Sequence, residues 1–172
     1  MCALPAVGHE HHAALLPHVN TLVELAEELD APHPPGFDVR LAAEHRFIIG
    51  QLVPHMERAE ATLYPELERL MQNRHSMTPM RREHDELRGL IRELGEFVGR
   101  DLTLGVRMRL RRVLYRTFAL LKTHLAEEEA YLGMLDRNLS QHEQEELGRA
   151  MEHATWGPSE VPPAAAASAA RR

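Results

Sequence analysis

Four long segments of the chain carry apolar residues at every third or fourth position, the spacing that places side chains on one face of an α-helix. Turn-forming residues separate the segments, so the pattern predicts helices over residues 10–29, 38–71, 78–99 and 102–137. Aromatic residues make up only 5% of the 172 residues, which argues against a sheet protein. Short connections make successive helices antiparallel neighbours. The predicted fold is therefore all-α, an up-down four-helix bundle.

The breaks between these helices have definite turn chemistry. Residues 30–36, DAPHPPG, contain three prolines and a glycine, which end the first helix because proline lacks an amide donor. Asp38 is the predicted N-cap of the second helix, and Pro65 is expected to kink it. Thr78 is predicted to cap the third helix, with Pro79 in its first turn. The connections therefore support the helix assignments.

The region after the fourth helix predicts one more helix and a loose end. Ser140 and Glu143 have the S-x-x-E spacing of a capping box, which opens a short fifth helix that runs to about His153. Residues 154–172 are rich in small residues and proline, so a disordered tail is expected there. The predicted organisation is a helical bundle over residues 9–153 and this tail.

Charge and cysteine content exclude several classes of protein. Twenty Lys and Arg against 26 Asp and Glu give a formal charge of -6 without a basic stripe, so nucleic acid is not an expected partner. No export signal and no membrane-spanning segment is recognised, which predicts a soluble, cytoplasmic protein. The single cysteine, Cys2, cannot form an internal disulfide and receives no role.

Histidine is the unusual component, with 12 residues in the chain. The apolar face of each of the four long helices contains one histidine, in chain order His12, His55, His84 and His124. One such histidine alone is usually a hydrogen-bonded core residue. Four together predict a metal centre, because a cation satisfies every imidazole at once and helix bundles build metal sites from facing helices.

The fourth helix adds a carboxylate to the same face. His124 and Glu128 are four residues apart, so their side chains point roughly 40° from each other and can bind one metal or bridge two. Imidazole and carboxylate ligands without a thiolate favour iron or manganese over a structural zinc site. A redox-active metal is therefore expected.

Other histidines are expected to bind no metal. His18 lies off the apolar face of the first helix, although a break at Pro17 would turn it inward. The rest are assigned to positions off that face, to connections or to solvated faces: His11, His33, His45, His75, His142 and His153.

Four motifs in order, HEHHAALLPHV, PHMERAEATLYPEL, MRREHDEL and HLAEEEAYL, resemble the hemerythrin-like (HHE cation-binding) family over about residues 9–137. The resemblance implies a four-helix bundle around a non-heme di-iron centre open to dioxygen. Family members carry or sense oxygen, handle iron or nitric oxide, or decompose peroxide. The metal ligands that the resemblance implies here are His12, His55, His84, His124 and Glu128.

The second motif departs from the family at its carboxylate. Ala59 stands where the family has a glutamate four residues after His55, and Glu60 follows, roughly 140° from His55 on an ideal helix. Glu60 is the predicted second carboxylate ligand, provided that Pro65 or a local π-bulge rotates this turn. Glu57 is the weaker alternative. One metal or two is open at this point.

Further candidates surround the implied ligands. Glu129 is the alternative to Glu128. Tyr64 and Tyr131 are candidate catalytic residues, as a phenolate ligand, hydrogen-bond donor or proton source, with core packing as the alternative. The third helix has Arg88 where oxygen carriers have a second histidine, which leaves more metal positions open and favours peroxide chemistry or iron sensing over reversible oxygen carriage.

The sequence thus predicts a non-heme di-iron protein that binds or reacts with dioxygen or hydrogen peroxide, with peroxide decomposition as the candidate activity. The alternative is a non-enzymatic oxygen, nitric oxide or iron sensor. A metal-free helical interaction protein with coincidental core histidines is the third reading.

Overall fold

The structure, a computed structural model, describes residues 4–32 and 34–152, and side chains from residue 12 to residue 151 within them. All regular structure in this part of the chain is helical. The elements in chain order are α1 (Leu4–Glu28), α2 (Phe37–Phe47), the π-helix η1 (Ile48–Leu52), α3 (Val53–Arg58), the π-helix η2 (Ala59–Leu63), α4 (Tyr64–Leu70), α5 (Thr78–Gly95), α6 (Leu104–Asn138) and α7 (Gln141–Glu152). The tail predicted over 154–172, and also His33 and His153, lie outside the described residues.

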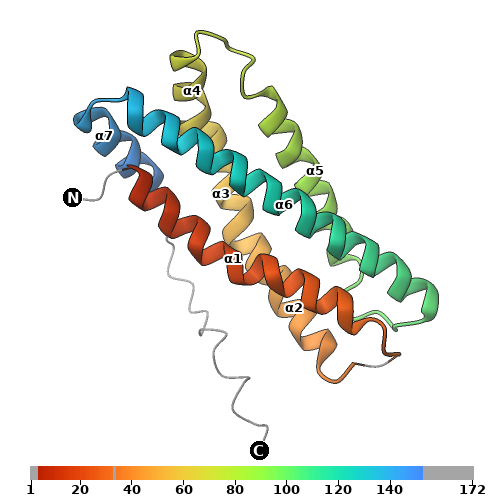
Figure 1. Ribbon diagram of the computed structural model, residues 1–172. Helices are drawn as coiled ribbons and strands as arrows, with labels where there is room; N and C mark the ends of the chain where they lie inside the picture. The colour runs from red at the N-terminus through yellow and green to blue at the C-terminus, as the bar shows by residue number, and fades with distance from the viewer. Residues whose placement is uncertain (1–3, 33, 153–172) are drawn as a thin grey trace, which may run out of the picture.

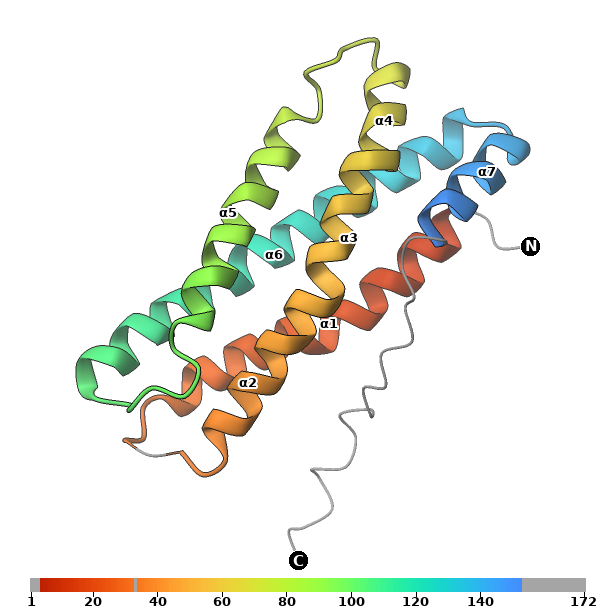
Figure 2. The same ribbon diagram turned by 180° about the vertical axis from the view of Figure 1, so that it is seen from behind.

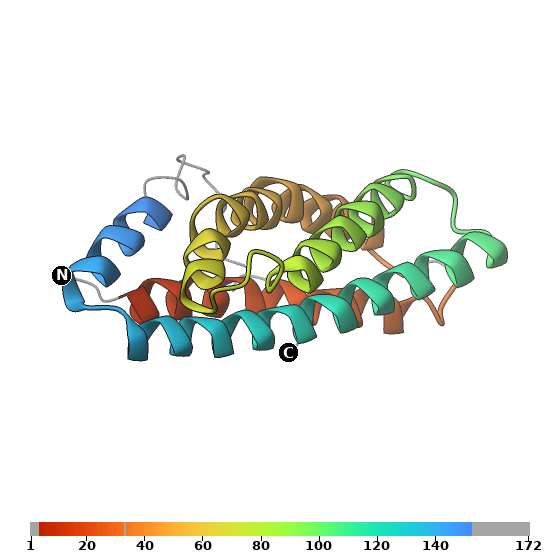
Figure 3. The ribbon, with the colours of Figure 1, turned by 90° about the horizontal axis from the view of Figure 1, so that it is seen from above.

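Four long helical runs form the predicted up-down bundle, with α2, η1, α3, η2 and α4 making one continuous run (Figures 1 and 2). α1 and α6 lie antiparallel, because His12 contacts Glu128 near one end and Arg107 donates to the carbonyl of Leu29 near the other. Viewed from above, α1 and α6 form one layer and the second run and α5 the other (Figure 3). Within the described residues, no helix is long and apolar enough to span a membrane.

The second run contains two π-helices, and one of them lies directly before α4, whose second residue is Pro65. Pro54 is the second residue of α3, which directly follows η1. Pro65 is the second residue of α4, which directly follows η2. A proline inside a helix lacks the amide hydrogen and clashes with the carbonyl four residues earlier. The wider π turns accommodate both prolines without ending the helix.

Two predicted caps are wrong and one is confirmed. The N-cap of α2 is Gly36, with φ 69°, and Asp38 lies in the first turn of the helix. Thr78 is the first residue of α5 and not its cap. The capping box of α7 is formed, because the Ser140 amide donates to Glu143 Oε2 at 2.8 Å. α7 then folds back beside the beginning of α1 (Figure 1).

α1 also begins earlier than predicted. It starts at Leu4 in place of residue 10, since Pro5 is compatible with the first turn of a helix. It then continues through Pro17 without a break.

The apolar core consists of two clusters with a polar layer between them. On α5, Leu87 belongs to one cluster and Met80 to the other, and His84 stands between them. On α6, Leu125 and Leu132 flank Glu128 in the same way. The inward polar residues therefore cross the bundle as one layer, enclosed by apolar side chains on both sides.

Candidate metal centre

The four predicted inward histidines are all buried. His12 and His55 are 6% exposed, and His84 and His124 are 0% exposed. Glu128 is 1% exposed. The 3-and-4 spacing of the sequence therefore identified the interior positions of the polar layer correctly.

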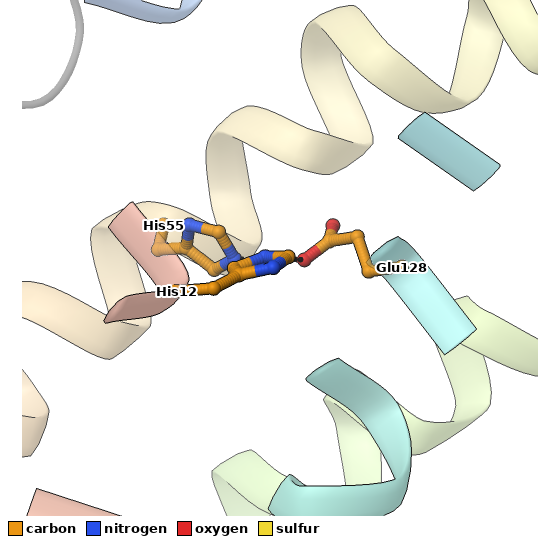
Figure 4. A group of neighbouring side chains, drawn as sticks. All are labelled: His12, His55 and Glu128. Atoms are coloured by element: carbon orange, nitrogen blue, oxygen red, sulfur yellow. Dashed lines mark hydrogen bonds and ion pairs between the residues drawn. The ribbon is translucent and has the colours of Figure 1, made fainter. Parts of the chain in front are cut away.

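Three of these residues converge from α1, α3 and α6 (Figure 4). His12 Nε2 lies 3.1 Å from Glu128 Oε2, and His55 Nε2 lies 2.9 Å from the same oxygen. One potential ligand atom from each residue lies within 4.8 Å of the other two, so the three can hold one cation. We call these residues the His12 group.

A second set, the His84 group, comprises His84, His124 and Tyr64 from α5, α6 and α4. His84 Nε2 lies 3.0 Å from His124 Nε2 and 3.1 Å from Tyr64 Oη. Glu128 Oε2 is 4.0 Å from His124 Nε2. Glu128 therefore stands between the two groups.

Carboxylates nearer the surface fix three of the imidazoles. His12 Nδ1 bonds to Glu129 at 2.9 Å, His84 Nδ1 to Glu60 at 2.7 Å and His124 Nδ1 to Glu83 at 2.9 Å. An ionised carboxylate only accepts hydrogen bonds, so each Nδ1 carries the proton and donates it. His12 also contacts a carboxylate through Nε2, so this ring donates from both nitrogens. In His84 and His124 the Nε2 atoms point into the polar layer, as in the carboxylate–histidine pairs of protein metal sites.

This arrangement places hydrogen-bond acceptors next to one another in the polar layer. The Nε2 lone pairs of His84 and His124 meet at 3.0 Å. Glu128 Oε1 is buried and has no hydrogen-bond partner among the described residues. Buried acceptors without donors are strongly unfavourable, so a proton or a cation must lie among them. The donor chemistry fits a metal ion.

Comparison with known proteins agrees with this geometry. The model of one family, the hemerythrin HHE cation binding domain, matches residues 7–135, a range that contains both groups. The chain belongs to this family. No curated protein and no solved structure matches the chain. Hemerythrin HHE domains bind metal cations, and α7 follows the matched range of this one.

The charges of this hemerythrin domain favour an anionic Glu128. Burial would raise the pKa of Glu128, but the charge of His55 and the hydrogen bonds of His12 and His55 hold it well below its ordinary value. Burial likewise opposes the charge on His12, yet Glu128 and Glu129 raise the pKa of this ring. Burial and the nearby His124 lower the pKa of His84 to about 4. An anionic Glu128 among four buried imidazole rings suits a cation.

Glu60, predicted as the second carboxylate ligand, lies on the outer side of His84. Its Oε1 contacts His84 Nδ1 and accepts from Arg88 Nη2 at 2.9 Å. The predicted π-bulge is present as η2, and Glu60 lies on the Nδ1 side of His84, away from the Nε2 atom that faces the polar layer. Glu57, the weaker alternative, is exposed.

The two candidate tyrosines differ in position. Tyr64 is nine residues after His55 and would point roughly 180° away on an ideal α-helix. The wider turns of η2 lie between them, and Tyr64 is fully buried in the His84 group. Burial and the charge of Glu128 raise the pKa of Tyr64, so the phenol keeps its proton. Tyr131 is half-buried and packs against the second apolar cluster.

Sequence reasoning missed Glu83, because its contact with His124 joins two helices and leaves no local signal. It also missed a second, partly buried pair. His18 Nδ1 contacts Glu44 Oε2 at 2.9 Å, and the His18 ring stacks on Phe47. His18 is thus turned toward α2, although α1 is unbroken at Pro17. Burial raises the pKa of Glu44, whose Oε1 has no partner among the described residues.

The prediction of a solvated face for His45 is wrong. Its ring is half-buried, and Nε2 donates to the carbonyl of Ile91 at 3.2 Å. Gly95 makes this approach possible, because an added Cβ would lie 2.7 Å from Nε2. His142 is exposed, as predicted.

Proposed function

We propose that this hemerythrin domain holds a non-heme di-iron centre that binds or reacts with dioxygen or hydrogen peroxide. The observation that carries the proposal is the pair of donor groups joined by Glu128. Each group offers two imidazole rings, and Glu128 Oε2 lies within 4.0 Å of Nε2 atoms of both groups. Carboxylates also fix three of the imidazoles through Nδ1. In this proposal the His12 group would hold one iron and the His84 group the other, and Glu128 would contribute its carboxylate between them.

Ligand chemistry supports iron. The donors are imidazole, carboxylate and phenol, without a thiolate, and such sets suit iron or manganese better than a structural zinc site. Membership of the hemerythrin family agrees with iron. When bound, an iron pair supplies the electrons that dioxygen or peroxide chemistry requires.

The protein has three tasks in this proposal. Glu60, Glu83 and Glu129 hold the imidazole tautomers, so their hydrogen bonds keep the Nε2 lone pairs available. The two apolar clusters exclude bulk water from the polar layer. Tyr64 holds a proton at Oη, beside His84, because burial keeps the phenol protonated.

Peroxide decomposition is the activity that we favour. Arg88 in place of a second histidine on α5 reduces the nitrogen ligands, which leaves room for a small ligand. Peroxide disproportionation consumes no protons overall but moves them from one peroxide molecule to another. The Tyr64 hydroxyl, 3.1 Å from His84 Nε2, is positioned to relay them. Tyr131 remains the second candidate, without a comparable contact in the described residues.

Metal analysis of the purified protein, with a near-ultraviolet and visible spectrum, tests the proposal. We expect about two irons per chain, absorption from the iron pair and steady-state decay of added peroxide. A reversible spectral change with dioxygen or nitric oxide but without peroxide turnover would favour the sensor alternative. Folded protein that takes up no transition metal would contradict both.

A further inference from the structure

A groove separate from the metal centre lies between the α2–α3 run and α5. Its volume is about 680 Å³, within the usual range for small-molecule sites. One wall carries His45, Ile49 and Val53, which are four residues apart and therefore share a helix side. The facing wall on α5 carries Asp85, Arg88, Ile91, Arg92 and Gly95, and Asp85 is paired with Arg88. No member of the His12 group or the His84 group lines it.

The inner surface of the groove is apolar. Ile49 is 49% exposed, and Val53 beside it is half-buried. Ile91 adds a third aliphatic side chain from the opposite wall. A ligand with an apolar body would cover this surface. Removing the apolar surface from water would favour binding.

A cation stands beside this apolar surface. Arg88 forms ion pairs with Glu60 and Asp85. Arg92, one helical turn later, makes one long bond from Nε to the carbonyl of Arg88 at 3.4 Å. Its terminal nitrogens have no partner among the described residues. A free guanidinium fork matches a carboxylate, which it binds through two parallel hydrogen bonds.

His45 lines the groove, and its ring is held in one position. Its Nε2 is held by the Ile91 carbonyl, and the ring lies where a Cβ of residue 95 would otherwise stand. The groove therefore has a defined shape, with an apolar surface, a fixed imidazole and one free arginine.

We infer that this groove binds a small organic carboxylate with an apolar body. The carboxylate pairs with the Arg92 guanidinium, and the body lies against Ile49, Val53 and Ile91. This site is independent of the metal centre, so it stands or fails apart from the proposed function.

Calorimetric titration of the full-length protein with hexanoate tests the inference. Acetate serves as a control that has the carboxylate but lacks the apolar chain of hexanoate. 1-Hexanol serves as a control that has the apolar chain but lacks the carboxylate. The variants are Arg92→Gln and Ile49→Asn, and Arg82→Gln is the matched control, because Arg82 is an exposed arginine of α5 outside the groove. Both altered groove side chains are exposed, so circular dichroism should show unchanged helix content.

We expect saturable 1:1 binding of hexanoate, with acetate and 1-hexanol at least tenfold weaker. Arg92→Gln should weaken hexanoate about tenfold, the usual effect of losing a charged hydrogen-bond partner. Ile49→Asn should weaken it several-fold, and Arg82→Gln should leave it within twofold. Absence of saturable binding, equal losses in Arg82→Gln and Arg92→Gln, or full affinity in Arg92→Gln, as for a carboxylate bound at the metal centre, would overturn the inference.

Discussion

Glu128 Oε2 lies 2.9 Å from His55 Nε2, in a contact that joins α6 to the middle of the second helical run. The carboxylate is 1% exposed, and its second oxygen has no partner among the described residues. A buried anion in this position is costly unless positive charge lies beside it. Four imidazoles and one carboxylate in a shared layer therefore indicate a binding site for cations.

Glu128→Gln should remove the negative charge of this side chain and keep its shape. We expect the bound metal to fall by half or more, and the metal-loaded protein to lose about 3 kcal/mol of unfolding free energy, as when one partner of a buried charge pair is removed. Elemental analysis and urea unfolding measure both effects. Glu127→Gln, an exposed neighbour on α6, is the control and should match the wild type in both.

Tyr64→Phe should slow peroxide decay about tenfold, because it removes one hydrogen-bonding hydroxyl beside His84. The variant loses only the Oη–His84 contact and keeps the buried ring. Tyr131→Phe is the comparison and should stay within twofold of the wild type. Equal rates in all three proteins, at equal metal content, would remove Tyr64 from the mechanism.

The interior histidines could be predicted from the sequence because an α-helix turns by a constant angle, and this applied even to His55. Tyr64 could not be placed, because the π-helix η2 changes the angle between it and His55. The sequence placed Glu60 on the correct helical turn. It did not show that Glu60 would contact the Nδ1 atom of His84. Pairings between helices, such as Glu83 with His124, depend on tertiary packing and leave no spacing signal in one sequence.

Glu44→Gln should stabilise the protein increasingly as the pH rises above about 4.5, the ordinary pKa of glutamate. Burial raises the pKa of Glu44 in the folded state, so the unfolded chain ionises first and folding stability is lost as the pH rises. Glutamine has no charge to bury. Urea unfolding of both proteins at pH 4 and pH 8 measures the difference.

The exposed Glu27 provides the matched control for this pH effect. Glu27→Gln should show the same pH dependence as the wild type. If Glu44→Gln loses stability at pH 8 relative to the wild type, the pair with His18 outweighs the burial of the carboxylate.

Two glycines of α5 should respond differently to alanine. Gly89→Ala meets no atom within 4 Å and should gain up to about 1 kcal/mol from helix propensity. Gly95→Ala should lose about 1 kcal/mol relative to Gly89→Ala, because its Cβ displaces the His45 ring from the Ile91 carbonyl. Thermal unfolding measures both.

The double variant His45→Ala with Gly95→Ala isolates this contact. If His45 is the obstacle, Gly95→Ala should cost less in the His45→Ala background than in the wild type, by about 1 kcal/mol. Additive effects of the two substitutions would show that the His45–Gly95 contact carries no energy.

Anomalous diffraction at the iron absorption edge, from crystals of protein grown with iron, tests the central claim most directly. The account predicts two peaks in the polar layer, one beside His12, His55 and Glu128 and the other beside His84, His124 and Tyr64. Crystals without an iron peak among these residues, although the helices keep this arrangement, would contradict it.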